Sequence, residues 1–198
     1  MNFAQIKERI APYKDILLFA IALFGANFFW KYTITGEENS TGPILWFELD
    51  ISAPFLWLAS HIAQVVYELV SLTRDSIWLY LPDVLRYNNG NAIRIVWGCT
   101  ALKQSFIWIC IMAVARGSWK HKLWFVPLGL IFIYLFNILR IYLITLAMEF
   151  HPDWFEFLHA YLFKYMFYFM LFMLWVWWNE KLRYLPNKNS APTLRFLT

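Results

Sequence analysis

The sequence predicts an all-α integral membrane protein whose chain crosses the bilayer several times as a polytopic helix bundle. Hydrophobic residues make up 61% of the 198 residues and charged residues 15%, against roughly 45–50% and about 25% in soluble domains. Aromatic residues make up 21%, and Trp and Tyr are typical of the two membrane–water interfaces. We therefore expect residues 1–198 to form a single membrane domain.

Four apolar runs are long enough to cross a membrane, for which a helix needs about 20 residues. These runs are residues 16–32, 99–115, 123–150 and 159–178. The first run lacks a convincing small-residue cleavage site, so we expect a retained anchor and not a signal peptide.

The distribution of Lys and Arg predicts the orientation of these four spans. Basic residues are concentrated in three segments, namely 1–14, 116–122 and 179–198. Because basic segments stay on the cytoplasmic side, four spans place all three segments and both termini inside. Residues 33–98 are then wholly extracytoplasmic, which agrees with the absence of Lys and Arg from the acidic segment 33–50.

A further helical segment at residues 52–72 is ambiguous. His61, Gln64 and Glu68 recur at intervals of three and four residues and therefore share one helical face. The segment can be an additional span with a polar stripe, or an interfacial or re-entrant helix. A full span would move the two later basic segments outside, so we favour four spans plus an extracytoplasmic helix. The turn-rich residues 73–98 are expected to form a loop or a small extramembrane cap.

Arg140 is unusual because it lies inside the apolar run 123–150, where a charge is costly unless something at that depth solvates it. It lies 17 residues from the inner end of that run, or about 25 Å of helix, in a hydrocarbon core about 30 Å thick. Cys99 and His159 begin their spans from the same outer side. We therefore expect the thiol, the guanidinium and the imidazole to lie at one depth in the outer leaflet.

These three groups are suited to acyl transfer. A thiolate can attack a peptide carbonyl, a histidine can transfer the proton, and a fixed cation can stabilise the oxyanion. Cys99 follows Gly98 at an expected helix start, where free N–H groups favour a thiolate. Supporting roles are expected for Lys103 beside the thiol, Glu156 as a partner of the imidazole, and Asn137 as a donor to the guanidinium or to a substrate.

Simpler interpretations of the same residues remain open. A cysteine at a span end is commonly a small buried hydrophobe, and Arg140 can snorkel to the interface or pair with Glu68 or Glu149. One rival function is a quinone-linked thiol oxidoreductase, but Cys99 and Cys110 would be about 16 Å apart along one helix, too far for a disulfide. The other rival is a non-catalytic membrane subunit or transporter in which Arg140 lines a polar path.

The order and spacing of the candidate residues resemble those of the exosortase/archaeosortase family of membrane-embedded transpeptidases. That family has a Cys followed by a small residue and Gly, an Asn-x-x-Arg in a later span, and a His at the start of the next span. The matching residues are Cys99-Thr100-Ala101, Asn137-Ile138-Leu139-Arg140 and His159. The resemblance covers residues 95–178, and this short chain resembles the compact members. Ala101 departs from the pattern, since the family commonly has Gly there.

The resemblance implies a cysteine transpeptidase or peptidase in the cytoplasmic membrane of a prokaryote. Its substrate would be a membrane-anchored secreted protein with a C-terminal sorting signal, made of a short motif, a transmembrane helix and a basic cluster. Cys99 would be the nucleophile, His159 the general acid/base, and Arg140 the group that stabilises the oxyanion. The product would pass to an acceptor, such as a lipid or a glycan, or to water. The bilayer is an expected partner and nucleic acid is not; no metal or cofactor is expected.

Overall fold

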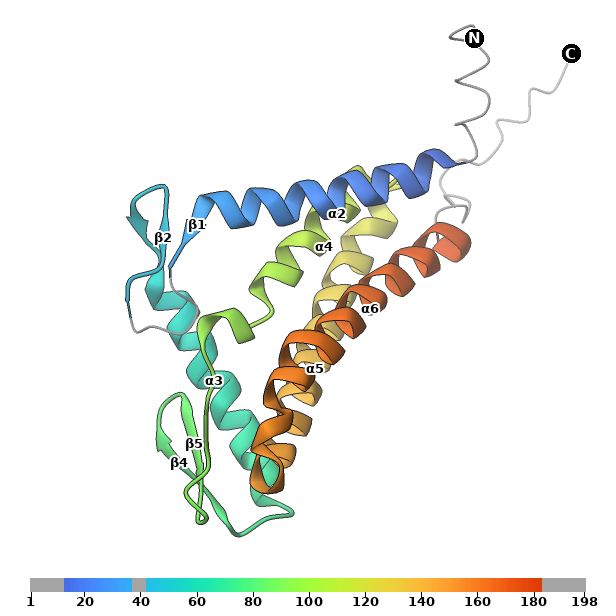
Figure 1. Cartoon of the computed structure of the whole chain (residues 1–198). Helices are drawn as coiled ribbons and strands as arrows, with labels where there is room; N and C mark the ends of the chain where they lie inside the picture. Colours follow the sequence, from blue (N-terminus) through green and yellow to red (C-terminus); the bar gives the residue numbers. More distant parts are fainter. Residues whose placement is uncertain (1–12, 37–41, 183–198) are drawn as a thin grey trace, which may run out of the picture.

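A computed structural model describes residues 13–36 and 42–182 (Figure 1). Its α-helices are α2 (Lys14–Thr33), α3 (Ser52–Ser71), α4 (Leu102–Val114), α5 (Trp119–Phe150) and α6 (Phe163–Trp177). Its strands are β1 (Ile34–Thr35), β2 (Leu45–Trp46), β3 (Leu49–Asp50), β4 (Ile77–Leu81), β5 (Val84–Tyr87) and β6 (Ala92–Arg94). Short 3₁₀ turns are η2 (Trp97–Cys99) and η3 (Pro152–Trp154), and π-helical turns are η4 (Phe157–Leu162) and η5 (Trp178–Leu182). The predicted cytoplasmic segments 1–14 and 179–198 lie largely outside the described residues.

The predicted fold class, an all-α polytopic membrane helix bundle, is confirmed. Four helical segments are long and apolar enough to cross a membrane, namely Lys14–Thr33, Ser52–Ser71, Trp119–Phe150 and Pro152–Lys181. Three of them contain the predicted spans 16–32, 123–150 and 159–178. The fourth is α3, the segment whose placement the sequence leaves open.

The predicted span 99–115 is wrong in its start and its length. The helix found there, α4, has 13 residues, or about 20 Å, which is less than the hydrocarbon thickness of about 30 Å. The helix cannot extend back to Cys99 because Ala101 has a left-handed backbone with φ of 59°. Hydropathy does not detect this break, because the break is a matter of backbone conformation and not of residue polarity.

The helices outline a triangle in Figure 1, with α2 as one side, α3 as the second, α5 with α6 as the third, and α4 inside. α4 packs on α2, α5 and α6, while α3 packs on α5. The basic hairpin between α4 and α5 forms one corner. There Arg116 Nε lies 3.4 Å from Asp15 Oδ1, and Trp178 Nε1 donates to Arg116 O over 2.9 Å. The start of α2 and the end of α6 therefore meet the hairpin at one end of the bundle.

A second corner joins the end of α2, the start of α3 and the turn η2. The ring of Phe55 lies 6.1 Å from that of Trp30 and 5.7 Å from that of Trp97, measured between centroids. In Figure 1 this corner lies at the far end of α2 from the basic hairpin, and α3 runs on from it toward the end of α5.

The core near the basic hairpin depends on a close approach between α4 and α5. Trp108 is fully buried, and its Nε1 donates to Val126 O over 3.2 Å. The indole lies against Gly129, where an added Cβ would come within 2.2 Å of Nε1. Glycine at this position therefore lets the two helices pack around the tryptophan.

A second core joins α3, the strands β4–β6 and the outer half of α5. One face of α3 is buried there, formed by Ala59, Ile62, Ala63, Val66 and Val70. The strands form an antiparallel sheet in the order β4-β5-β6. The expectation of a loop or small cap at residues 73–98 is thus refined to an ordered sheet. Its short strands carry too weak an alternation to be recognised from sequence.

The β5–β6 hairpin holds the end of α5. Tyr87 OH donates to Thr145 O over 2.9 Å, and burial is the main cause that raises the Tyr87 pKa to about 12. The side chains of Asn89 and Asn91 donate to Glu149 O (2.7 Å) and to Met148 O (2.9 Å). These carbonyls belong to the last turn of α5, where they have no partner within the helix. The sheet therefore caps α5 and fixes its position beside β6.

Candidate active site

Cys99 is the last residue of η2, which connects β6 to α4. Its N–H donates to Val96 O over 2.8 Å, and the residue is 8% exposed. The expectation that Cys99 begins a helix is wrong, because α4 begins at Leu102. The dipole of α4 is therefore not aligned on the thiol in the way that the sequence suggested.

His159 lies next to Cys99, with its Nε2 3.4 Å from Cys99 Sγ. It does not open its span as expected, because the helical segment already begins at Pro152. His159 belongs instead to the π-helical turn Phe157–Leu162. Such turns are rare in proteins, and those that occur are frequently found at functional sites. Its ring stacks on that of Phe155, with centroids 5.2 Å apart and an interplanar angle of 9°.

Arg140 and Asn137 reach the same region from α5. Arg140 is 6% exposed and interacts electrostatically with both Cys99 and His159. Its Nε has no hydrogen-bond partner among the described residues. Asn137 is fully buried, and its Nδ2 donates to Cys99 O over 2.7 Å. Asn137 thus holds the main chain of Cys99, where the sequence suggested a bond to the guanidinium or to a substrate.

The two other supporting residues are Glu156 and Lys103. Glu156 is exposed, and within the described part of the chain no hydrogen bond or ion pair joins it to His159. The role of Glu156 as a partner of the imidazole therefore stays a prediction, and the contact that the structure gives the imidazole is the stacked ring of Phe155. The spacing of four residues between Phe155 and His159 is the signal that could have revealed this pair. Lys103 is half-buried in the first turn of α4, and its supporting role stays a prediction.

Cys99 and His159 line a pocket of about 560 Å³, a size usual for ligand sites. One wall is formed by β6 and the residues after it, namely Ala92, Ile93, Arg94 and Val96. The opposite wall is formed by the end of α5 and the turn that follows, with Met148, Pro152 and Phe155. The sequence did not reveal the first wall, since residues 73–98 showed no clear strand pattern.

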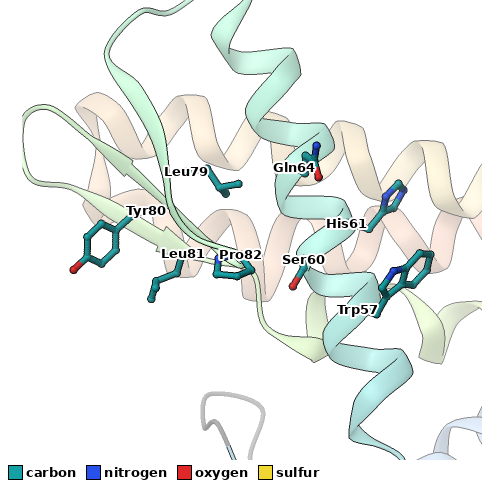
Figure 2. A pocket seen from close by; sticks show the side chains of 8 residues that line it. All are labelled: Trp57, Ser60, His61, Gln64, Leu79, Tyr80, Leu81 and Pro82. Carbon is teal, nitrogen blue, oxygen red and sulfur yellow. The ribbon is translucent and has the colours of Figure 1, made fainter.

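The polar stripe on α3 lies elsewhere. His61 and Gln64 line a second pocket of about 550 Å³, with Leu79–Pro82 opposite them, as Figure 2 shows. His61 Nε2 lies 2.9 Å from Tyr134 OH, and Gln64 Nε2 donates to Glu68 Oε1 over 3.2 Å. The two pockets share no lining residue, and Arg140 lines neither of them.

The alternative ion pairs of Arg140 are not formed among the described residues. Glu149 Oε2 instead lies 3.5 Å from Arg74 Nε, and Glu68 accepts the bond from Gln64. The guanidinium is therefore buried, interacts electrostatically with the thiol and the imidazole, and forms no ion pair with a carboxylate of the described segments. Such a cation is available to an anion that develops at the site.

The arrangement has the parts of an activated nucleophile. A thiol lies within hydrogen-bonding distance of an imidazole, which can take its proton, and a cation stands beside both. In the described ranges no group of three or more His, Cys, Asp or Glu side chains is placed to hold a metal ion. The chemistry open to these residues is nucleophilic attack by sulfur with proton transfer through the histidine.

The fold and the site together define a multi-pass α-helical membrane protein with a cysteine and a histidine paired in a pocket. Comparison with protein-family models matches residues 16–178 to the transmembrane exosortases. Because this match covers most of the 198 residues, the chain belongs to the transmembrane exosortase family, and the resemblance found at Cys99, Asn137, Arg140 and His159 correctly predicted that membership. Searches of curated proteins and of solved structures found no match.

Proposed function

We propose that this protein is a cysteine transpeptidase or peptidase that cleaves the C-terminal sorting signal of membrane-anchored secreted proteins. The observation that carries the proposal is the distance of 3.4 Å between Cys99 Sγ and His159 Nε2. This distance allows direct proton transfer between a thiol and an imidazole. Membership of the exosortase family supports the same class of reaction.

In the first half of the proposed reaction, Cys99 Sγ attacks the carbonyl carbon of the scissile peptide bond. His159 takes the thiol proton, and the carbonyl oxygen becomes an oxyanion beside the guanidinium of Arg140. When the C–N bond breaks, His159 gives the proton to the leaving amine. The product is a thioester between Cys99 and the new C-terminus, while the transmembrane helix and basic cluster depart.

In the second half, an acceptor nucleophile or water attacks the thioester. His159 takes a proton from the attacking group, and the sulfur leaves as the Cys99 thiolate, which is then reprotonated. The acceptor, for which a lipid or a glycan is the candidate, decides between transfer and hydrolysis. Asn137 keeps the Cys99 main chain in place through both halves, since it binds the carbonyl oxygen of that residue.

The proposed topology has both termini in the cytoplasm and the site on the extracytoplasmic side of a prokaryotic inner membrane. The basic hairpin supports this orientation, because the start of α2 and the end of α6 contact Arg116. Arg140 lies 21 residues beyond the first residue of α5, or about 32 Å along the helix, at the opposite membrane face. α3 starts where α2 ends, which supports an extracytoplasmic position for α3 and the β4–β6 sheet.

The test compares cells that carry the natural protein with cells that carry Cys99→Ala. Exported proteins are collected from membranes and from the medium, and their C-terminal peptides are identified by mass spectrometry. The proposal expects proteins that end before a hydrophobic segment and a basic cluster in the first strain, and full-length forms of them in the second. Identical C-termini in both strains would refute it.

Arg140→Ala and Arg140→Lys separate the catalytic proposal from the non-catalytic alternative. If Arg140 stabilises an oxyanion, Arg140→Ala lowers processing at least about 100-fold, while Arg140→Lys retains part of it because a cation remains. If the protein is a non-catalytic subunit or transporter, processing is insensitive to Cys99→Ala. Processing that is lost in Cys99→Ala and partly kept in Arg140→Lys therefore indicates the catalytic function, whereas processing that Cys99→Ala leaves unchanged indicates the non-catalytic one.

A further inference from the structure

The pocket that contains Cys99 has an open strand edge as one of its walls. The sheet order is β4-β5-β6, so β6 has a neighbour on one side only. Ala92, Ile93 and Arg94, which make up β6, all line the pocket. An edge strand has a row of main-chain donors and acceptors that another extended chain can use.

The register of the hairpin shows which groups of β6 point outward. Tyr87 N donates to Asn91 O, and Ile95 N donates to Asp83 O, each over 2.8 Å. These bonded pairs alternate with the pairs Val84–Arg94 and Arg86–Ala92. In an antiparallel ladder the residues of the alternate pairs direct N–H and C=O away from the partner strand. The main-chain groups of Ala92 and Arg94 are therefore the ones directed toward the open edge.

These outward groups are free among the described residues, since Ala92 and Arg94 belong to the pairs without ladder bonds and no other main-chain hydrogen bond involves them. The apolar side chains of Met148, Pro152 and Phe155 line the same pocket. The edge leads to Cys99 through Val96, whose carbonyl accepts the Cys99 N–H. An extended chain bound along β6 would therefore run toward the thiol.

We propose that the peptide segment of the substrate binds as an added strand along β6, so that its scissile bond reaches Cys99. This inference rests on the proposed function, since it concerns the substrate of the same site. Main-chain bonds to Ala92 and Arg94 supply affinity without regard to sequence. Side chains of an added strand alternate in direction between the two faces of the sheet, so those on one face can contact the apolar residues Met148, Pro152 and Phe155 of the pocket and contribute specificity.

The test uses a tethered peptide, because this requires neither knowledge of the sorting motif nor acyl transfer. In a Cys110→Ala background, the detergent-purified full chain has Cys99 as its single cysteine. The probe is acetyl-Val-Thr-Val-Thr linked to a thiol and offered as its pyridyl disulfide. Cys99 thiolate attacks the sulfur of the peptide, a mixed disulfide forms, and pyridinethione leaves. Intact-mass spectrometry then measures the fraction of protein that retains the peptide at increasing mercaptoethanol concentration.

The decisive comparison is a scan of N-methylated peptides, which leaves the protein unaltered. Methylation of an amide that bonds to β6 should lower the mercaptoethanol concentration for half release by roughly three- to tenfold. Methylation of the amides between them should leave it unchanged. Loss at alternate positions supports the added strand, whereas equal retention by all peptides, or losses without alternation, overturns it.

A matched pair of protein variants gives the same comparison from the other side. Ala92→Pro removes the outward N–H, and Ala92→Ser keeps it. Ala92→Pro should weaken retention of the unmethylated peptide by a similar factor, and Ala92→Ser should not. Unchanged retention by Ala92→Pro overturns the proposal. A simple alkyl thiol tethered to both variants shows that Cys99 itself is intact, because its retention should be the same in each.

The outcome is separable from that of the proposed function. Alternating losses in the scan, together with C-termini that do not change in Cys99→Ala cells, would support the strand site and refute the peptidase. Processing that depends on Cys99, together with a scan that does not alternate, would support the peptidase and refute only strand addition.

Discussion

The side-chain amide of Asn137 binds the main-chain carbonyl of Cys99, with 2.7 Å between Nδ2 and O. The two residues are 38 positions apart in sequence and belong to α5 and η2. Because Asn137 is fully buried, this bond has no competition from bulk water. It fixes the turn that carries the thiol to the helix that carries Arg140, so the two groups keep their relative position.

Replacement of Asn137 by Leu should destabilise the protein by about 1–3 kcal/mol, because the buried carbonyl of Cys99 loses its donor. Thermal unfolding in detergent measures this loss. Thr145→Val is the matched control on the same helix, since Thr145 is equally buried and its Oγ1 has no partner among the described residues. Thr145→Val should be neutral or stabilising. Equal losses in the two variants would show that the Asn137 bond is not the cause.

Replacement of His159 by Gln should slow alkylation of Cys99 by iodoacetamide at neutral pH at least about tenfold, since the base next to the thiol is removed. The measurement needs no substrate and is made in a Cys110→Ala background. His151→Gln is the control, because His151 is exposed and stacks on Trp154. An unchanged rate in His159→Gln would contradict activation of the thiol by the histidine.

Phe155→Ala and Glu156→Gln test which neighbour positions the imidazole. Phe155 stacks on the ring of His159, so its removal should lower the same alkylation rate roughly five- to twentyfold by releasing the ring from its position. Glu156 is exposed, and Glu156→Gln should change the rate less than about twofold. The reverse order of effects would identify the carboxylate as the partner of His159.

Ala101→Gly tests the left-handed turn between η2 and α4. Relief of the strain at φ of 59° is worth about 1 kcal/mol, which offsets the flexibility of glycine in the unfolded chain. The free energy of unfolding should therefore change by less than about 1 kcal/mol. Ala63→Gly is the control inside α3, where a similar buried methyl group is lost and the helix is weakened by about 1 kcal/mol in addition. A larger loss for Ala101→Gly would contradict the strained conformation.

Gly129→Ala and Gly25→Ala test the packing of α4 on α5. A Cβ at Gly129 would meet the indole of Trp108 at 2.2 Å, whereas a Cβ at Gly25 would have no neighbour within 4 Å. Gly129→Ala should destabilise the protein by about 1–3 kcal/mol through overpacking. Gly25→Ala should be neutral or stabilising by up to about 1 kcal/mol, because alanine is the better helix former. Thermal unfolding of the two variants gives the comparison.

Fold class and family could be predicted because each depends on properties read along the chain. The fraction of apolar residues and the length of the apolar runs already define a membrane helix bundle. The pairing of Cys99 with His159 could be anticipated because membrane thickness turns a position in sequence into a depth. Counting residues from the basic hairpin therefore predicted that groups from three separate segments meet before any contact was known.

Counting along the chain could not reveal contacts that depend on direction within the membrane plane or on local backbone geometry. Depth alone left Asn137 free to face the guanidinium, whereas packing of α5 against η2 turns its amide to Cys99 O. The left-handed conformation of Ala101 makes α4 begin only at Leu102, after the chain has come from β6 through η2, and the residue type alanine gives no sign of this conformation. Glu156 and Phe155 are neighbours in sequence, and it is the ring of Phe155 that stacks on His159.

The sequence alone therefore determined the class of fold and the family, and it predicted that the three groups share one depth, since hydrophobicity, charge bias and residue spacing are local quantities. Only the tertiary structure decided how close Cys99 Sγ is to His159 Nε2, which residues hold each of them, and that β6 forms a wall of their pocket. These features depend on side chains that meet from distant segments, and close packing selects among partners that lie at the same depth.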